Sequence, residues 1–386
     1  MPTVFISPEI RFAGRAFSAF QVCGHTGLLL GFVQSMILVN RMGLSSLVFL
    51  GITGVVILTF YAVVMATKIL TGEEQIIYYH HEIVVMAMIA LFLRLTHQPV
   101  LRYLDIAILG IGLFLACGRV GCLMVGCCHG LPARWGVRYR PEHAKAGFPE
   151  CFVGVQLFPV QALESLFVFL MVLLGVVLLL RGSRPGEALE WYTVVYGWGR
   201  FSFEFFRGDS DRPYYWGFSQ AQWISSVLMA GLVWAEFRGA IPFHRWHVGA
   251  CAAILSTMLG VAVSRRVRRV PEHLLLHPRH VREVAEMMSA VYDPRRRFLQ
   301  AARVGCTSLG VLISADLVRK PGYRIFHYAV SARNTPLTDA SARLLAGLIL
   351  RLRHSSCATS ELMRGNHGVF HIVVPVARRT TAARAA

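Results

Sequence analysis

Long, nearly uncharged apolar segments recur through the first 264 residues of this chain. A helix that crosses a bilayer needs about 20 mostly apolar residues, so segments of this kind are typical of membrane spans. Hydrophobic residues make up 55% of the chain and charged residues only 16%, whereas soluble domains are about 25% charged. This composition disfavours a soluble globular enzyme and excludes a disordered chain or a small disulfide scaffold.

Eight segments are candidate membrane helices. Six are strongly apolar, whereas the segment 80–93 is short and the segment 191–206 contains Arg200 and Glu204. We therefore predict an all-α polytopic membrane protein with about seven to eight transmembrane helices, followed by a small α+β soluble domain. The six strongly apolar segments are residues 22–39, 44–66, 104–125, 160–180, 220–234 (with an extension to residue 236) and 247–263.

Positive charge is concentrated in the last third of the chain. Of the 39 Lys and Arg residues, 21 follow residue 264, together with only 7 of the 21 Asp and Glu residues. We place a domain boundary there, between a transmembrane domain (1–264) and a basic C-terminal soluble domain (265–386). Arg265, Arg266, Arg268 and Arg269 follow the last apolar segment directly, and such clusters normally stay cytoplasmic. Eight spans then place the N-terminus inside and seven place it outside.

The basic C-terminal segment has the pattern of a small α+β domain. Helical patterns cover 273–288 and 340–352, β-branched and aromatic runs cover 304–317, 323–332 and 369–376, and 378–386 has the composition of a disordered end. No nucleic-acid recognition motif accompanies the charge, so no nucleic-acid partner is predicted. Attraction to anionic lipid headgroups, at about 1 kcal/mol per basic residue near the surface, is one interpretation. A solvated domain kept on the cytoplasmic side by its charge is the other.

Few ionisable side chains interrupt the apolar segments. A charge at membrane depth is costly, so each of these side chains is a candidate functional residue. Arg200 and Glu204 are four residues apart and share a helix face, so they also fit a purely structural ion pair. The set comprises His80, His81, Glu82, Arg119, Glu164, Arg200, Glu204 and Arg207.

Four glycines and four thiol or imidazole side chains crowd the segment 118–130. Glycines at this density indicate a sharp turn or a close backbone approach. Its Cys-x4-Cys-Cys-His spacing lacks the paired Cys-x2-Cys halves of a structural zinc site. Cys122 is therefore better explained as a small buried apolar residue, and we predict neither a metal nor a cofactor.

Four ordered motifs resemble the prolipoprotein diacylglyceryl transferase family, over roughly residues 20–238. The first is Gly118-Arg119-Val120-Gly121-Cys122 with the turn 126–130 and Trp135-Gly136-Val137, and the second is Phe158-Pro159-Val160-Gln161-Ala162-Leu163-Glu164. The third is Tyr196-Gly197-Trp198-Gly199-Arg200-Phe201-Ser202-Phe203-Glu204-Phe205-Phe206-Arg207-Gly208-Asp209. The fourth is Gly217-Phe218-Ser219-Gln220-Ala221-Gln222-Trp223-Ile224-Ser225.

The resemblance implies a multi-pass enzyme of the bacterial inner membrane that acts in lipoprotein biosynthesis. Enzymes of this family transfer a diacylglyceryl group from phosphatidylglycerol to the cysteine thiol of a prolipoprotein lipobox and release glycerol phosphate. Phosphatidylglycerol, a lipobox peptide and the surrounding lipids are thus the implied partners. The residues carried over as catalytic are His80, His81, Arg119, Tyr196, Arg200 and Glu204, and those carried over as substrate-binding are Cys122, Gly126, Gln161, Glu164 and Arg207.

This chain departs from the family pattern near the expected headgroup site. Cys122 replaces the signature asparagine, and Val125-Gly126-Cys127 replaces Asn-Gly-Glu. His81 is followed by Glu82 and Ile83 rather than by two glycines, and Phe158 replaces a histidine. These departures leave two alternatives open: a divergent protein that binds or moves anionic lipid without thiol transfer, and metal transport through the Cys/His turn.

The expected chemistry is attack of a thiol on a glycerol carbon. Because a free thiol has a pKa near about 8.5, the reaction needs a base, and an imidazole at His80 or His81 suits that task. The two histidines are equally explained as part of an interfacial aromatic belt with Tyr78 and Tyr79. Arg119 and Arg200 suit the leaving phosphate, because a guanidinium stays charged when desolvated.

Overall fold

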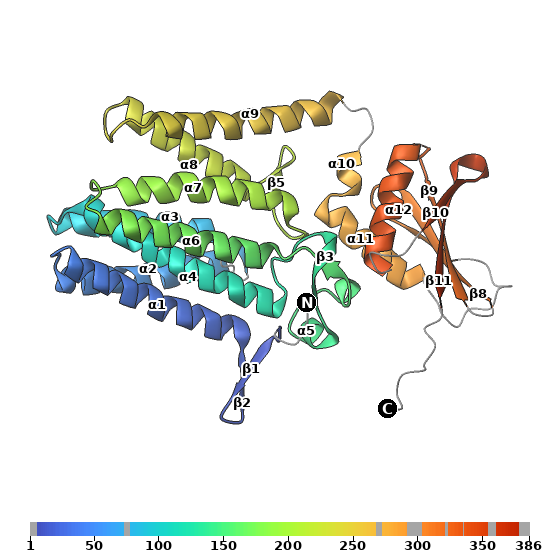
Figure 1. Ribbon diagram of the computed structural model, residues 1–386, viewed down its shortest axis with the longest axis horizontal. Coiled ribbons are helices and arrows are strands. Elements are labelled where there is room, and N and C mark those ends of the chain that lie inside the picture. The colour runs from blue at the N-terminus through green and yellow to red at the C-terminus, as the bar shows by residue number, and fades with distance from the viewer. Residues whose placement is uncertain are drawn as a thin grey trace.

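The computed structural model describes residues 6–72, 78–267, 272–291, 303–320, 323–334, 336–353 and 360–377. Within this part of the chain, eight long helices form a bundle, and each overlaps one of the eight predicted segments (Figure 1). They are α1 (Ala19–Arg41), α2 (Ser46–Thr71), α3 (Tyr78–Leu95), α4 (Val100–Val125), α6 (Val160–Leu180), α7 (Glu187–Phe203), α8 (Gln220–Phe237) and α9 (Arg245–Val267).

Five of the described helices, α1, α2, α4, α6 and α9, are long and apolar enough to cross a membrane. Their outer faces expose large aliphatic side chains, such as Leu58 (73% exposed) and Ile69 (79% exposed). Large aliphatic side chains on adjoining helices are mostly buried in soluble proteins, whereas in a bilayer they contact the lipid tails. The chain is thus a mostly helical, multi-pass membrane protein. The predicted count of seven to eight spans exceeds the five helices that meet both criteria.

Helix α4 forms the centre of the bundle and packs closely against α1. A β-carbon at Gly31 of α1 would lie 2.7 Å from the carbonyl oxygen of Gly110 in α4. Small residues at helix crossings allow this close backbone approach in membranes. On the other side of α4, a β-carbon at Gly112 would lie 2.7 Å from both Tyr192 of α7 and Val172 of α6. The glycines therefore bring four helices together around one centre.

Irregular segments cover one end of the bundle. The turn after α4 and the loop after α7 are joined by a β-bridge between Gly130 and Arg207. The short elements of the N-terminal segment and these loops are β1 (Glu9–Phe12), β2 (Arg15–Ser18), β3 (Pro132–Arg138), α5 (Pro141–Lys145), η2 (Glu150–Phe152), β4 (Gln156–Leu157), η3 (Glu204–Phe206), β5 (Tyr214–Tyr215) and β6 (Phe218–Ser219).

The C-terminal segment contains a five-stranded antiparallel sheet in the order β10-β11-β9-β8-β7. The predicted helix 273–288 is divided at Pro278, which begins α11, and the predicted strand 304–317 is divided by a turn at Gly310 (φ 76°). The elements are α10 (Glu272–Leu275), α11 (Pro278–Val291), β7 (Val304–Cys306), β8 (Val311–Lys320), β9 (Tyr323–Ala332), α12 (Asp339–Arg353), β10 (Glu361–Arg364), η4 (Asn366–Gly368) and β11 (Phe370–Ala377).

The sheet shares its hydrophobic core with the loops at the end of the bundle. Tyr139 and Phe152 from those loops are buried in the same cluster as Val284 of α11 and Ile313 of β8. The C-terminal segment therefore lies against the irregular end of the bundle, as Figure 1 shows. The segment 378–386, predicted to be disordered, lies outside the described residues, as do Arg268 and Arg269.

Candidate active site

Two arginines from different helices meet at one buried carboxylate. The Nε of Arg119 in α4 lies 3.0 Å from one carboxylate oxygen of Glu164 in α6, and a terminal nitrogen of Arg200 in α7 lies 3.8 Å from the other. The Glu164 side chain is 1% exposed. Because burying a charge is unfavourable unless it is paired, each guanidinium holds the carboxylate in place and is held by it.

A second carboxylate extends this network toward the loop after α7. Glu204 lies 2.7 Å from Arg200 and 3.6 Å from Arg207, and it also contacts Arg212. Asp209 completes the group at 2.8 Å from Arg207 and 3.1 Å from Arg212. The structure thus brings together Arg119, Glu164, Arg200, Glu204 and Arg207, which the sequence had singled out separately.

The network carries an excess of positive charge. Its four arginines face three carboxylates, Glu164, Glu204 and Asp209. All four guanidinium-bearing side chains are at most 12% exposed. A monoanionic phosphodiester would balance this charge, and guanidinium groups bind phosphate oxygens in a bidentate manner. The arrangement is therefore suited to an anionic lipid headgroup.

Aromatic side chains border the network on the α7 side. The ring of Tyr196 lies 5.8 Å from that of Tyr79 in α3 and 5.4 Å from that of Tyr192. The Tyr79 hydroxyl shares a 2.7 Å hydrogen bond with Ser225 of α8. This bond ties the start of α3 to α8 beside the charged network. Tyr196 therefore lies between Tyr79 and Tyr192, one helical turn before Arg200 on α7.

The two candidate base residues lie at the start of α3 and contact different helices. His80 is within hydrogen-bonding distance (3.2 Å) of Gln220 at the start of α8. His81 is buried, and its ring lies 5.0 Å from that of Phe60 in α2. His80 is therefore oriented toward the fourth sequence motif, whereas His81 packs toward α2.

The turn after α4 lies beside the network and is fixed by Gln161. The Gln161 side-chain amide donates to the carbonyl of Cys127 at 2.9 Å and to the Tyr139 hydroxyl at 3.4 Å. Gly126 ends α4 with φ 91°, and a β-carbon there would lie 2.7 Å from the ring of Phe148. Gly126 and Gln161 thus hold the turn in position.

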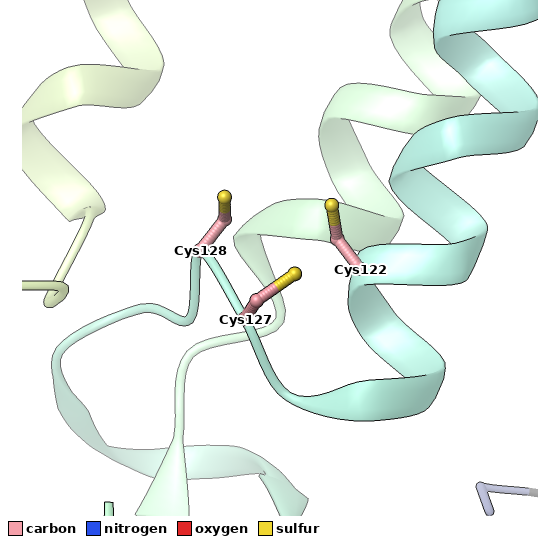
Figure 2. Close-up of side chains that lie close together, drawn as sticks. All are labelled: Cys122, Cys127 and Cys128. Atoms are coloured by element: carbon pink, nitrogen blue, oxygen red, sulfur yellow. The ribbon is translucent and has the colours of Figure 1, made fainter. Parts of the chain in front are cut away.

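The sulfurs of Cys122, Cys127 and Cys128 all lie within 4.8 Å of one another (Figure 2). The pKa of Cys128 is held well below its usual value, because thiols of Cys122 and Cys127 hydrogen-bond to it and Arg207 lies nearby. Burial lowers the pKa of His129, so its imidazole is neutral near pH 7. The sequence spacing argued against a metal site here, and the fold of the turn now shows that the three sulfurs lie close together.

The network also contains Asp209 and Arg212, which were not among the candidate site residues. Asp209 stood inside the quoted third motif without a role, and Arg212 lies three residues further on. The alternation of acidic and basic residues at 204, 207, 209 and 212 was a usable signal, because such residues reach one another across a tight turn. Only the loop geometry shows that all four charges face the same interior.

The fold and the site define the class of the protein: it is an integral membrane protein with a helical bundle and a buried network of arginines and carboxylates. The chain belongs to the prolipoprotein diacylglyceryl transferase family, whose model matches residues 20–237. The match includes all four arginines of the network and ends with α8, so that α9 and the C-terminal sheet lie beyond it.

Similar proteins are named phosphatidylglycerol–prolipoprotein diacylglyceryl transferases. The protein from Clostridium tetani is 29% identical over 119 residues, covering 31% of this chain and 46% of the relative. Transferase 2 from Clostridium perfringens is 33% identical over 137 residues (34% and 50%), and a Dehalococcoides mccartyi protein is 30% identical over 140 residues (36% and 52%). The chain spans about half the length of the curated relatives it matches.

Proposed function

We propose that this protein transfers the diacylglyceryl group of phosphatidylglycerol to the cysteine thiol of a prolipoprotein lipobox, in the bacterial inner membrane. The observation that carries the proposal is the convergence of Arg119, Arg200 and Glu204 on one buried network through Glu164. Three separate family motifs supply these residues. Similar proteins bear the name of this activity, and the network has the charge that an anionic headgroup requires.

In the proposed reaction the acceptor sulfur attacks the glycerol carbon that bears the phosphate. A carbon–sulfur bond forms, the carbon–oxygen bond to the phosphate breaks, and glycerol phosphate leaves with the electron pair. Arg119 and Arg200 bind the phosphate and stabilise the charge that develops on it. Glu164 and Glu204 orient these two guanidinium groups, at 3.0 Å and 2.7 Å.

The remaining predicted site residues take supporting roles in this proposal. His80 or His81 accepts the thiol proton, and Tyr196 and Arg207 border the headgroup. Cys122, Gly126 and Gln161 shape the adjoining turn. The three shorter helices α3, α7 and α8 complete eight spans, and residues 265–386 form a basic cytoplasmic domain that faces anionic lipid.

The test is mass spectrometry of a synthetic lipobox peptide incubated with the purified full chain in phosphatidylglycerol vesicles. We expect the peptide mass to rise by one diacylglyceryl group and glycerol phosphate to appear in equal amount. Arg119→Ala and Arg200→Ala should each abolish the product, because removing one donor to the developing charge lowers kcat by about 10²–10³. Unchanged product in both variants contradicts the assignment.

A second function, binding or moving anionic lipid without thiol transfer, is favoured by Cys122 in place of the family's asparagine. It uses the same arginines. Phosphatidylglycerol binding that is lost in Arg119→Ala, without any release of glycerol phosphate by the parent protein, would support this function instead.

A further inference from the structure

The last turn of α4 and the residues after it gather three thiols at one point beside the arginine network. Cys122 comes from α4, and Cys127 and Cys128 come from the turn (Figure 2). We propose that these cysteines form a site for a thiophilic divalent cation, Zn²⁺ above all, with its fourth coordination position open to the acceptor thiol.

The spacing of the sulfurs suits such a cation. Zinc–sulfur bonds are about 2.3 Å long, so tetrahedral geometry places the sulfurs about 3.8 Å apart. The three sulfurs already lie within 4.8 Å of one another. Small changes in side-chain torsion therefore bring all three to bonding distance from a common centre.

The backbone of the turn adopts unfavourable dihedral angles, and these angles bring the thiols close together. Cys128 has φ 53°, in the left-handed region that non-glycine residues avoid at a cost of about 1–2 kcal/mol. Gly126, at φ 91°, reverses the chain just before it. Gln161 fixes the intervening carbonyl of Cys127. Two backbone conformations and one side-chain hydrogen bond thus preorganise the thiols.

The neighbouring histidine does not complete the coordination. The ring of His129 packs against Phe148 and Phe152, with centroids 5.6 and 5.1 Å away, and its Nδ1 lies 3.0 Å from the carbonyl of Gly130. Across the described residues, no His, Asp or Glu atom joins the three sulfurs within the same distance. Three protein ligands with an open position are the pattern of catalytic rather than structural zinc.

Two arginines of the network lie close enough to the thiols to interact with a loaded site. Zn²⁺ with three thiolates carries one negative charge, and Arg119 and Arg207 both interact electrostatically with Cys128. Arg119 and Cys122 are three residues apart on α4, so they share one helix face. The cation site and the phosphate-binding network are therefore neighbours.

The role of the fourth position rests on the proposed function. A thiol that coordinates zinc loses its proton, which the histidine base of the proposed reaction accepts. The bound thiolate then attacks the glycerol carbon, the new carbon–sulfur bond replaces the carbon–oxygen bond, and glycerol phosphate leaves toward the arginines. No electron is gained or lost by the metal. This arrangement lowers the pKa of the acceptor thiol, so that its thiolate is available at neutral pH.

The first test measures metal on the reduced full chain in detergent, by elemental analysis and by titration with Zn²⁺ and Co²⁺. We expect about one equivalent and a sulfur-to-Co²⁺ charge-transfer band. The triple variant Cys122→Ser/Cys127→Ser/Cys128→Ser should lose both. The single variant Cys127→Ser, at an exposed position, should bind at least about tenfold more weakly. The control Cys306→Ser, which removes an exposed thiol of β7, should match the parent protein.

Equal metal in the parent and triple variants overturns the site. So does a disulfide within the cluster when the protein is purified without oxidant and mapped unreduced. The second test measures lipid transfer after chelation and again after Zn²⁺ is restored. Loss of lipid transfer on chelation and its recovery with Zn²⁺ support binding of the acceptor thiol at the fourth position. If chelation leaves lipid transfer unchanged, this role is overturned. Metal binding with no transfer by the parent protein contradicts the proposed function while the cation site stands.

Discussion

Glu164 lies between Arg119 and Arg200, and its two oxygens face one guanidinium each. Removing one partner from a buried ion network lowers the stability of the protein strongly, because a desolvated charge is left unpaired. Replacing the whole network by apolar residues has a much smaller effect. Glu164, which the family resemblance predicts to be a substrate-binding residue, therefore has a structural role: it keeps two positive groups close together.

Glu164→Gln is expected to destabilise the protein by about 3–5 kcal/mol, because it removes the negative charge from between two buried guanidinium groups. Thermal unfolding of the detergent-solubilised chain measures the effect. Glu142→Gln is the matched control, since Glu142 pairs with Arg140 at 3.7 Å with both side chains about half exposed. Such surface pairs contribute about 0–1 kcal/mol. Equal shifts in the two variants would contradict the structural role.

Helix α9, which lies beyond the region matched by the family model, is joined to the bundle by buried polar contacts. Its His247 is 1% exposed and bonds to Glu236 at the end of α8, which is 3% exposed. His244, just before α9, lies 3.6 Å from Glu190 of α7. These polar contacts fix the start of α9 at the end of the bundle opposite the arginine network.

His247→Ala should loosen α9, because it leaves the Glu236 carboxylate buried without its partner. Cys251, one turn further and 7% exposed, reports the change. We expect its alkylation by a maleimide, followed by peptide mass spectrometry, to accelerate by at least about tenfold, the equivalent of 1.4 kcal/mol. Thr257→Ala, on the exposed face of the same helix, should leave the rate unchanged. A parent-like rate in His247→Ala would refute this anchoring.

Helix α11 carries a buried histidine whose protonation opposes folding. The Nδ1 of His280 lies 2.8 Å from the carbonyl of Leu275, and its Nε2 lies 3.1 Å from the Thr307 hydroxyl. Both bonds are satisfied by a neutral ring that donates from Nδ1 and accepts at Nε2. Burial lowers the pKa of His280 below its ordinary value of 6.5.

Because this pKa is depressed in the folded state, the unfolded chain binds the proton more readily, and stability falls as pH drops below about 6.5. We expect hydrogen exchange in α11 to be faster at pH 5.5 than at pH 7.5, after correction for intrinsic rates. His280→Gln should weaken this pH dependence. His277, with a pKa lowered by burial to about 4, contributes in the same direction. A pH dependence unchanged by the substitution would exclude His280 as its source.

At the scale of the whole molecule, the C-terminal segment contacts the loop that completes the arginine network. Arg279 of α11 donates to the backbone carbonyls of Ser210 and Arg212 at 3.3 and 3.2 Å. Arg282 donates to the Ser210 hydroxyl at 2.8 Å. Part of the basic charge of the chain therefore holds a site loop rather than a lipid surface.

The double variant Arg279→Ala/Arg282→Ala should lower lipid transfer by about 10- to 100-fold, because small displacements of positioning groups have effects of this size. Faster hydrogen exchange at residues 209–212 should accompany the loss. The double variant Arg343→Ala/Arg351→Ala, at two exposed arginines of α12, is the control with matched charge. Unaltered exchange in the loop would show that α11 does not position it.

The sequence alone determined the class of fold and the set of candidate residues. An apolar segment long enough to cross a bilayer is predicted to be helical, because its backbone groups must hydrogen-bond to one another in lipid. All eight predicted segments are helical, and the strand 323–332 coincides with β9. The ordered motifs likewise identified Arg119, Arg200 and Glu204, because local spacing along a helix is a property of the sequence.

Tertiary structure decided which of these residues meet. Glu164 pairs with arginines 45 residues before and 36 residues after it because helices α4, α6 and α7 pack together, and no local periodicity encodes that register. The three cysteines converge only because the turn at Gly126 and Cys128 adopts left-handed backbone angles. The sequence thus identifies the charged residues of the network and the thiols beside it. Their distances from one another depend on packing between distant segments, which only the tertiary structure shows.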